Sequence, residues 1–252
     1  MNPIAKFVDE LQEVSLLLWG VVAGLFRPHR YPGEIIRQMD LIGVGSLTVV
    51  MLTGFFTGAV LALQTSKTLS TFGAKGLTGS LVAVSLVREL GPVLSALMVT
   101  GRVVSAISAE LGSMVVSEQI AAMRALGTDP IRKLVVPRVL AGFFMAPVLT
   151  VIANTVGILG GWLIAVFQLR VASSLYWSSI IEGLYFDDAI MGLVKPFCLG
   201  YAIVTIGCHV GLRTKGGTQG VGRATTQAVV AASVAVIAVD FFVTRLLIGV
   251  LY

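Results

Sequence analysis

The feature that most constrains this chain is a set of long segments without any charged residue. Residues 41–66 and 139–169 contain no Asp, Glu, Lys or Arg over 26 and 31 consecutive positions. A helix of about 20 apolar residues is enough to cross the hydrocarbon core of a bilayer. Only 12% of the 252 residues are charged and 56% are hydrophobic, whereas about 25% of residues are charged in a soluble domain. We therefore predict an integral membrane protein.

Three further apolar segments qualify as spans although they carry charges. They are residues 76–101 with Arg88 and Glu89, 189–212 with Lys195, and 224–251 with Asp240 and Arg245. The sequence therefore predicts an all-α fold with five transmembrane helices.

The first 26 residues have a different pattern. Apolar residues recur at helical spacing, and the charged residues between Lys6 and Glu13 lie on the opposite face, as in an amphipathic helix. Its uncharged part, residues 14–26, is too short to cross a membrane, so we expect it to lie in the bilayer interface. Two parts result: an interfacial helix with a connector over 1–40, and a five-span domain over 41–252.

Basic residues are distributed unevenly between the predicted loops. With the N-terminus in the cytoplasm, the inner segments hold twelve of the 18 Lys and Arg residues and the outer ones hold three, Lys67, Lys75 and Arg170. Basic loops favour the cytoplasmic side, so we predict a cytoplasmic N-terminus and a periplasmic C-terminus. The same bias explains the net charge of +5 without a nucleic-acid partner.

The predicted periplasmic segment, residues 170–188, is rich in aromatic residues. It contains Tyr176, Trp177, Tyr185 and Phe186. Aromatic side chains are enriched at membrane–water interfaces, so we expect a short interfacial stretch here.

The cytoplasmic segment 102–138 has the pattern of two helices separated by a glycine. Residues 117–126 predict a short helix, Gly127 a left-handed stop, and Asp129 with Pro130 the cap and first turn of the next helix. Such a segment can dock a soluble partner rigidly, or it can be a solvated connecting loop. Spacing alone leaves both open.

A glycine-rich segment over residues 216–225 invites comparison with a phosphate-binding loop. Arg223 and Ala224 stand where that motif needs Lys and Ser or Thr. We instead predict a tight turn before the last span, with Thr225 or Thr226 as the N-cap. ATP hydrolysis is then expected on another chain. His29 and His209 lie in unrelated segments and HExxH is absent, so we predict no catalytic residue and no metal site.

Charges inside predicted spans are costly and usually functional. Arg88 and Glu89 are neighbours, so they project about 100° apart on a helix and each needs another partner. Lys195 with Asp240 or with Glu89 are the pairs we expect. These four charges sum to zero, which fits a structural ion network or a headgroup site, and Arg88 alone suggests contact with an anionic headgroup.

Three pairs of glycines have the four-residue spacing that allows membrane helices to approach closely. They are Gly54 and Gly58, Gly157 and Gly161, and Gly207 and Gly211. We predict that they form packing seams.

Several longer motifs together resemble the MlaE/YrbE family from about residue 35 to the end. They are Leu86-Val-Arg-Glu-Leu-Gly-Pro92, Glu110-Leu-Gly-Ser-Met114, the run from Glu118 to Pro130, Val136-Pro-Arg138 and Gly220-Val-Gly-Arg-Ala-Thr-Thr226. The resemblance implies the permease subunit of an ABC transporter that moves phospholipid or a related lipid between the inner membrane and a periplasmic Mce-protein assembly. It also implies a homodimer in a Gram-negative inner membrane, with ATP and Mg²⁺ bound by a separate ATPase and no cofactor here.

The same resemblance assigns roles to particular residues. A coupling helix for the ATPase would use Glu118, Met123, Arg124, Leu126, Gly127 and Asp129. Lipid would be held by Leu61, Gln64, Leu69 and Phe72, with Arg88 and Glu89 nearby. Two alternatives remain open: an ion-coupled secondary transporter with Glu89, Lys195 and Asp240 as a proton relay, and a membrane anchor for Mce proteins that transports nothing.

Overall fold

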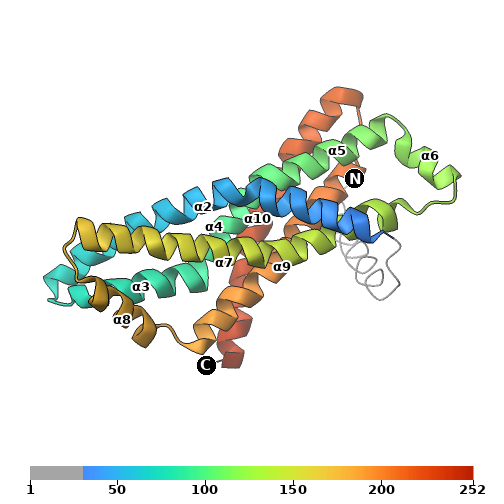
Figure 1. Cartoon of the computed structure of the whole chain (residues 1–252). Helices are drawn as coiled ribbons and strands as arrows, with labels where there is room; N and C mark the ends of the chain where they lie inside the picture. The colour runs from blue at the N-terminus through green and yellow to red at the C-terminus, as the bar shows by residue number, and fades with distance from the viewer. Residues whose placement is uncertain (1–30, 252) are drawn as a thin grey trace, which may run out of the picture.

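A computed structural model describes residues 31–251, and this part of the chain consists of helices and connections without a strand. Five helical segments in it are long and apolar enough to cross a membrane (Figure 1): Pro32–Thr71, Lys75–Val116, Ile131–Phe167, Phe186–Leu212 and Gly217–Leu251. The five predicted spans are confirmed. The predicted interfacial helix and His29 lie outside the described residues.

Each span is either a single α-helix or a series of consecutive helical segments. The first is α2 (Pro32–Thr71) and the last two are α9 (Phe186–Leu212) and α10 (Gly217–Leu251). The second joins η1 (Lys75–Leu77), α3 (Thr78–Ser85), η2 (Leu86–Leu90), α4 (Gly91–Val99), η3 (Thr100–Val104) and α5 (Ser105–Val116). The third joins η4 (Ile131–Val135) to α7 (Val136–Phe167). Two short helices, α6 (Gln119–Ala125) and α8 (Ser173–Gly183), lie at opposite ends of the bundle (Figure 1).

Helices α2 and α7 run side by side over most of their length (Figure 1), and glycines make this approach possible. A Cβ atom at Gly58 would collide with the carbonyl oxygen of Gly157, and one at Gly54 would lie 2.5 Å from the carbonyl oxygen of Ala153. Gly211 is held in the same way against Ser108 of α5. The predicted packing seams are therefore confirmed.

We expect Gly58→Ala to lower the free energy of unfolding by about 1–3 kcal/mol, because the obstructing atom belongs to the backbone and cannot rotate away. Gly33→Ala is the matched control, since it lies in the same helix and a Cβ atom added there would meet no atom within 4 Å. The measurement is the melting temperature of the purified protein in detergent. Equal melting temperatures for the two variants would contradict the seam.

Helix α8 turns back from the end of α7 and packs along α3 (Figure 1). Its Tyr176 is fully buried and donates a hydrogen bond to the carbonyl oxygen of Ile158 at 3.1 Å. Burial raises the pKa of this phenol, so it stays a donor. Tyr176 is therefore a core residue and not the interfacial anchor that we predicted, whereas Tyr185 and Phe186 are well exposed.

The segment before the last span also differs from the prediction. Helix α10 already begins at Gly217, after a turn in which Gly216 and Gly217 have positive φ angles of 92° and 66°. The Thr225 and Thr226 hydroxyls donate to backbone carbonyls one turn earlier in the same helix. The N-cap prediction was wrong because the turn needs only these two glycines, and Gly220 and Gly222 are accommodated within the helix.

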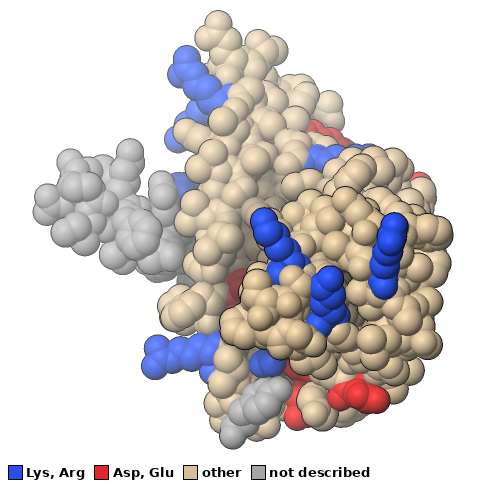
Figure 2. Space-filling model, turned by 90° about the vertical axis from the view of Figure 1, so that its left-hand side faces the viewer, with Lys and Arg blue, Asp and Glu red and all other residues tan. Residues whose placement is uncertain are grey.

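Exposed cations gather at the two ends of the bundle in unequal numbers. Lys67, Lys75 and Arg170 are exposed in or beside the connections at the end that carries α8. Figure 2 shows separate basic side chains on a mostly uncharged surface at this end. Exposed cations at the end that carries α6 are Arg37, Arg124, Arg132, Lys133, Arg213, Lys215 and Arg223. We refer to these as the α8 end and the α6 end.

Candidate functional site

An ion cluster centred on Lys195 joins three spans. The Lys195 side chain is fully buried, and its Nζ atom lies 2.5 Å from Oε2 of Glu89 in η2 and 3.5 Å from Oδ1 of Asp240 in α10. It also donates to the carbonyl oxygen of Arg88 at 2.8 Å. The contacts with Glu89 and with the Arg88 carbonyl are hydrogen bonds, whereas the contact with Asp240 is an ion pair without a hydrogen bond. Both predicted pairs of Lys195 are present together.

Pro92 explains why the carbonyl of Arg88 needs this lysine. In a regular helix that carbonyl would accept from the backbone N–H of residue 92, and proline has none. Residues Leu86–Leu90 form a π-helical turn immediately before it. The Lys195 ammonium therefore replaces a missing backbone donor while it neutralises the carboxylate of Glu89.

Arg88 has a different partner, which the sequence analysis did not identify. Its Nε atom lies 3.3 Å from Oδ1 of Asp188, whose side chain is 2% exposed. The other carboxylate oxygen of Asp188 accepts a hydrogen bond from the backbone N–H of Tyr185 at the start of α9. We had placed Asp188 in a periplasmic loop. The seven-residue spacing between Asp188 and Lys195 places both on one face of a helix, but the spacing does not identify Arg88 as the partner of Asp188.

The cluster now has five charged members, some buried and some partly exposed: Arg88, Glu89, Asp188, Lys195 and Asp240. Lys195 and Asp188 are buried, whereas the side chains of Arg88 and Glu89 are 30% and 44% exposed. The four charges of the predicted network sum to zero, and Asp188 as a fifth member brings the formal charge of the cluster to −1. The cluster fixes η2 against α9 and α10, and it leaves one guanidinium edge and one carboxylate edge accessible from outside the bundle.

The connection between the second and third spans contains only residues 117–130, because α5 continues to Val116. We call it the connecting segment. Glu118 has a left-handed conformation (φ 58°) and the short helix α6 follows it, so the helix begins two residues later than predicted. Gly127 has φ 73°, and Oδ1 of Asp129 accepts from the backbone N–H of Ile131 at 2.9 Å. The predicted glycine stop and Asp cap are confirmed.

Helix α6 is held by one face and presents the other. Ile120 is 6% exposed and Met123 packs against the main apolar core. On the outer side Arg124 is exposed, and Leu126 is 82% exposed at the tip of the segment. Arg124 and Leu126 are therefore accessible to a partner outside this chain.

An ion pair between a buried arginine and an exposed glutamate joins the two helices that flank the connecting segment. The guanidinium of Arg138 in α7 is 1% exposed and lies 2.8 Å from Oε2 of Glu110 in α5. It also donates to the carbonyl oxygen of Leu134, one turn earlier. The pair therefore joins the two helices between which the connecting segment lies.

The four residues assigned to lipid contact lie at the α8 end of α2, with Phe72 just beyond its last residue, and they differ in exposure. Gln64 and Phe72 are exposed, whereas Leu61 and Leu69 are half-buried. Leu61 packs against the small core of Val82 and its neighbours. Gln64 and Phe72 are the most accessible of the four, and Leu61 and Leu69 are partly accessible. Within residues 31–251 no three His, Cys, Asp or Glu side chains gather in a way that would hold a metal ion.

The family model "Permease MlaE" matches residues 35–246, which covers every element of this arrangement. The chain belongs to the MlaE permease family. It is 34% identical to the Haemophilus influenzae protein named "Intermembrane phospholipid transport system permease protein MlaE", with 98% of this chain and 95% of the relative covered.

Other relatives of this MlaE-family chain come from distant organisms. A "Probable ABC transporter permease protein" of Rickettsia felis is 43% identical over 96% of this chain and 93% of its own length. The chloroplastic "Protein TRIGALACTOSYLDIACYLGLYCEROL 1" of Arabidopsis thaliana is 32% identical over 94% of this chain and 68% of its own length. Five apolar helices and this family membership identify a multi-pass protein of the inner membrane.

Proposed function

We propose that this chain is the membrane permease of an ABC transporter that moves phospholipid or a related lipid between the inner membrane and a periplasmic Mce-protein assembly. The observation that carries the proposal is family membership over residues 35–246 combined with the exposed tip of α6. The Haemophilus relative is named for intermembrane phospholipid transport. An ATPase on a separate chain supplies the energy and binds ATP and Mg²⁺.

In this proposal the α6 end faces the cytoplasm and the α8 end faces the periplasm. Exposed cations are more numerous at the α6 end, and basic residues favour the cytoplasmic side of a membrane. Leu126 and Arg124 then project toward the ATPase, with Glu118 and Asp129 at the two ends of the docking surface. Movement of α6 reaches the spans through the ion pair of Arg138 with Glu110.

The proposal also includes a second copy of this chain and a lipid cavity between the copies. A line of exposed residues at four-residue spacing runs along α2 through Leu52, Phe56, Val60 and Gln64. Residues at this spacing share one face of a helix. Two such faces opposite each other form an apolar cavity with an amide near its periplasmic mouth, and closure of the ATPases narrows it.

We expect a photoreactive benzoyl-phenylalanine at Gln64 to cross-link to copurified phospholipid in the purified transporter. The control position is Ile36, which is 67% exposed in the same helix but lies at the α6 end. Mass spectrometry of the adducts measures both yield and lipid class. Equal yields at Gln64 and Ile36 in detergent would contradict a lipid cavity at the α8 end of α2, because bilayer lipid that only surrounds the protein is removed from both.

A further inference from the structure

Arg102 is an exposed arginine inside a membrane span. We had placed it in the cytoplasmic segment 102–138, but it belongs to η3 within the second span. A Cβ atom added at Gly207 of α9 would lie 3.1 Å from Cγ1 of Val104 in η3, and α9 continues beyond this level to Leu212. Both helices run toward the α6 end. At 1.5 Å per residue, Arg102 therefore lies about 10 Å inside the end of α9.

The guanidinium of Arg102 is fixed against α2. Its Nη1 atom donates to the carbonyl oxygen of Leu41 at 3.1 Å and to the hydroxyl oxygen of Ser46 at 3.2 Å. A Cβ atom added at Gly45 would collide with the same guanidinium. A glycine at this position of α2 therefore makes the space in which the Arg102 head group lies.

The opposite edge of this guanidinium has no partner in the described part of the chain. Within residues 31–251 the Nε and Nη2 atoms of Arg102 make no hydrogen bond or ion pair. Asp40 is the acidic residue of α2 nearest to Gly45 in the sequence, but the five-residue separation places it about 140° away around the helix. The Nε and Nη2 edge carries parallel N–H groups that bind two phosphate oxygens at once.

An apolar surface continues from this cation toward the α8 end. Gly45 lies seven residues before Leu52, so both are on one face of α2. Leu52 begins the line with Phe56 and Val60, whose side chains are well exposed. Arg102 therefore lies at the α6 end of the line that we assign to the lipid cavity. A phosphate at the guanidinium with acyl chains along α2 matches this order of surfaces.

We propose that Arg102 binds the phosphate of a phospholipid whose acyl chains lie along the exposed line of α2. A cation inside a membrane span is costly, and a lipid phosphate supplies the anion that the described residues do not. This inference rests on the proposed function for the orientation of the chain, which places the bound lipid in the cytoplasmic leaflet. A free phosphate ion offers the same chemistry and is distinguished by the experiment.

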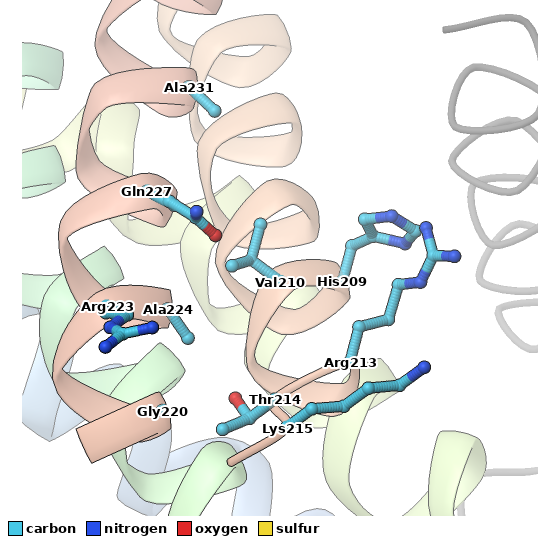
Figure 3. A pocket seen from close by; sticks show the side chains of 10 residues that line it. All are labelled: His209, Val210, Arg213, Thr214, Lys215, Gly220, Arg223, Ala224, Gln227 and Ala231. Atoms are coloured by element: carbon cyan, nitrogen blue, oxygen red, sulfur yellow. The ribbon is translucent and has the colours of Figure 1, made fainter. Parts of the chain in front are cut away.

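The test uses the full chain in detergent micelles, without an ATPase or an Mce protein. Phosphatidylglycerol and diacylglycerol with the same acyl chains are added in equal amounts, and native mass spectrometry measures the ratio of the two bound lipids. We expect Arg102→Gln to lower the preference for phosphatidylglycerol about tenfold, because hydrogen bonds to a charged group are lost. Lys215→Gln is the matched control. It removes an exposed cation at the same end, in the turn between α9 and α10 (Figure 3), and should keep the preference.

A second variant moves the guanidinium and keeps its charge. Gly45→Ala places a Cβ atom where the Arg102 head group lies, and alanine is favoured over glycine in a helix. We expect Gly45→Ala to fold and to lose the preference for phosphatidylglycerol as well. Gly33→Ala is its control, since a Cβ atom there meets no atom within 4 Å.

Three results would overturn the proposal. One is an unchanged lipid ratio in Arg102→Gln or in Gly45→Ala, and another is an equal loss in Lys215→Gln, which would mean that the lipid responds to overall charge. The third is displacement of phosphatidylglycerol from the unmodified protein by excess inorganic phosphate, which would assign the edge to a free ion. These ratios are measured without transport, so a failure of this inference is distinct from a failure of the proposed function.

Discussion

Replacing Lys195 by Met is expected to destabilise the protein by about 3 kcal/mol, because removal of one member of a buried ion cluster leaves its partners without compensation. Glu89 and Asp240 would then lie close together as two carboxylates with no cation between them. The carbonyl of Arg88 would also lose its donor, which Pro92 cannot replace. The expected observation is a low yield of monodisperse protein and a large fall in melting temperature in detergent.

A variant in which the same cluster carries no charge shows whether the lost stability comes from unbalanced charge or from lost packing. Lys195→Met combined with Glu89→Gln and Asp240→Asn keeps the side-chain sizes and removes all three charges. We expect this triple variant to recover most of the lost stability, since a buried ion pair can often be replaced by neutral groups at little cost. A triple variant as unstable as Lys195→Met alone would contradict the ion-cluster explanation.

The triple variant also separates the proposed function from a proton-coupled alternative. A relay through Glu89, Lys195 and Asp240 needs groups that ionise, and the triple variant has none of them. We expect ATP-driven lipid movement to persist in it. Complete loss of movement in a well-folded triple variant would favour the relay.

The second large effect is expected at the tip of α6. Leu126→Asp should abolish association with the ATPase and with it lipid transport, because a charge replaces the most exposed apolar contact of the segment. Leu126 is 82% exposed, so the fold and melting temperature should remain unchanged. We expect a charge in an apolar contact to cost about 2 kcal/mol, the size of an interface hot spot, which corresponds to a loss of about thirtyfold in affinity.

Leu77→Asp is the matched control for this experiment. Leu77 is a 54% exposed leucine in the short helix η1 at the opposite end of the bundle. Copurification of the ATPase with each tagged variant measures association. Retention of the ATPase by Leu126→Asp, or its loss from Leu77→Asp as well, would show that α6 is not the docking element.

The number of spans and the character of the connecting segment were predictable from local patterns. Long uncharged runs predict helices, because backbone hydrogen bonds must be made within the segment when it crosses lipid. Gly127 and Asp129 predict where one helix ends and the next begins. Close packing of helices at Gly58 and Gly157 was predictable, because these residues have no Cβ atom to hold two helices apart. Each of these inferences needs only neighbours in the sequence.

The inferences that failed depended on contacts between distant parts of the chain. Tyr176 is an aromatic residue of the type that anchors proteins at a membrane interface, yet α8 folds back on α3 and buries its side chain. Asp188 was counted as a loop residue because nothing nearby in the sequence shows that Arg88 lies beside it. Thr225 resembles a cap, but the glycines at 216 and 217 already start the helix.

The most direct test of the central claim is ATP-dependent lipid transfer by the permease reconstituted in proteoliposomes with the proposed ATPase and Mce partners. Fluorescent phospholipid moving between the vesicles and the Mce assembly is measured with ATP, with a non-hydrolysable analogue, and with a proton uncoupler. We predict transfer that needs ATP hydrolysis, is insensitive to the uncoupler and is lost in Leu126→Asp. Transfer that proceeds without ATP, or that stops when the proton gradient is removed, would contradict the account.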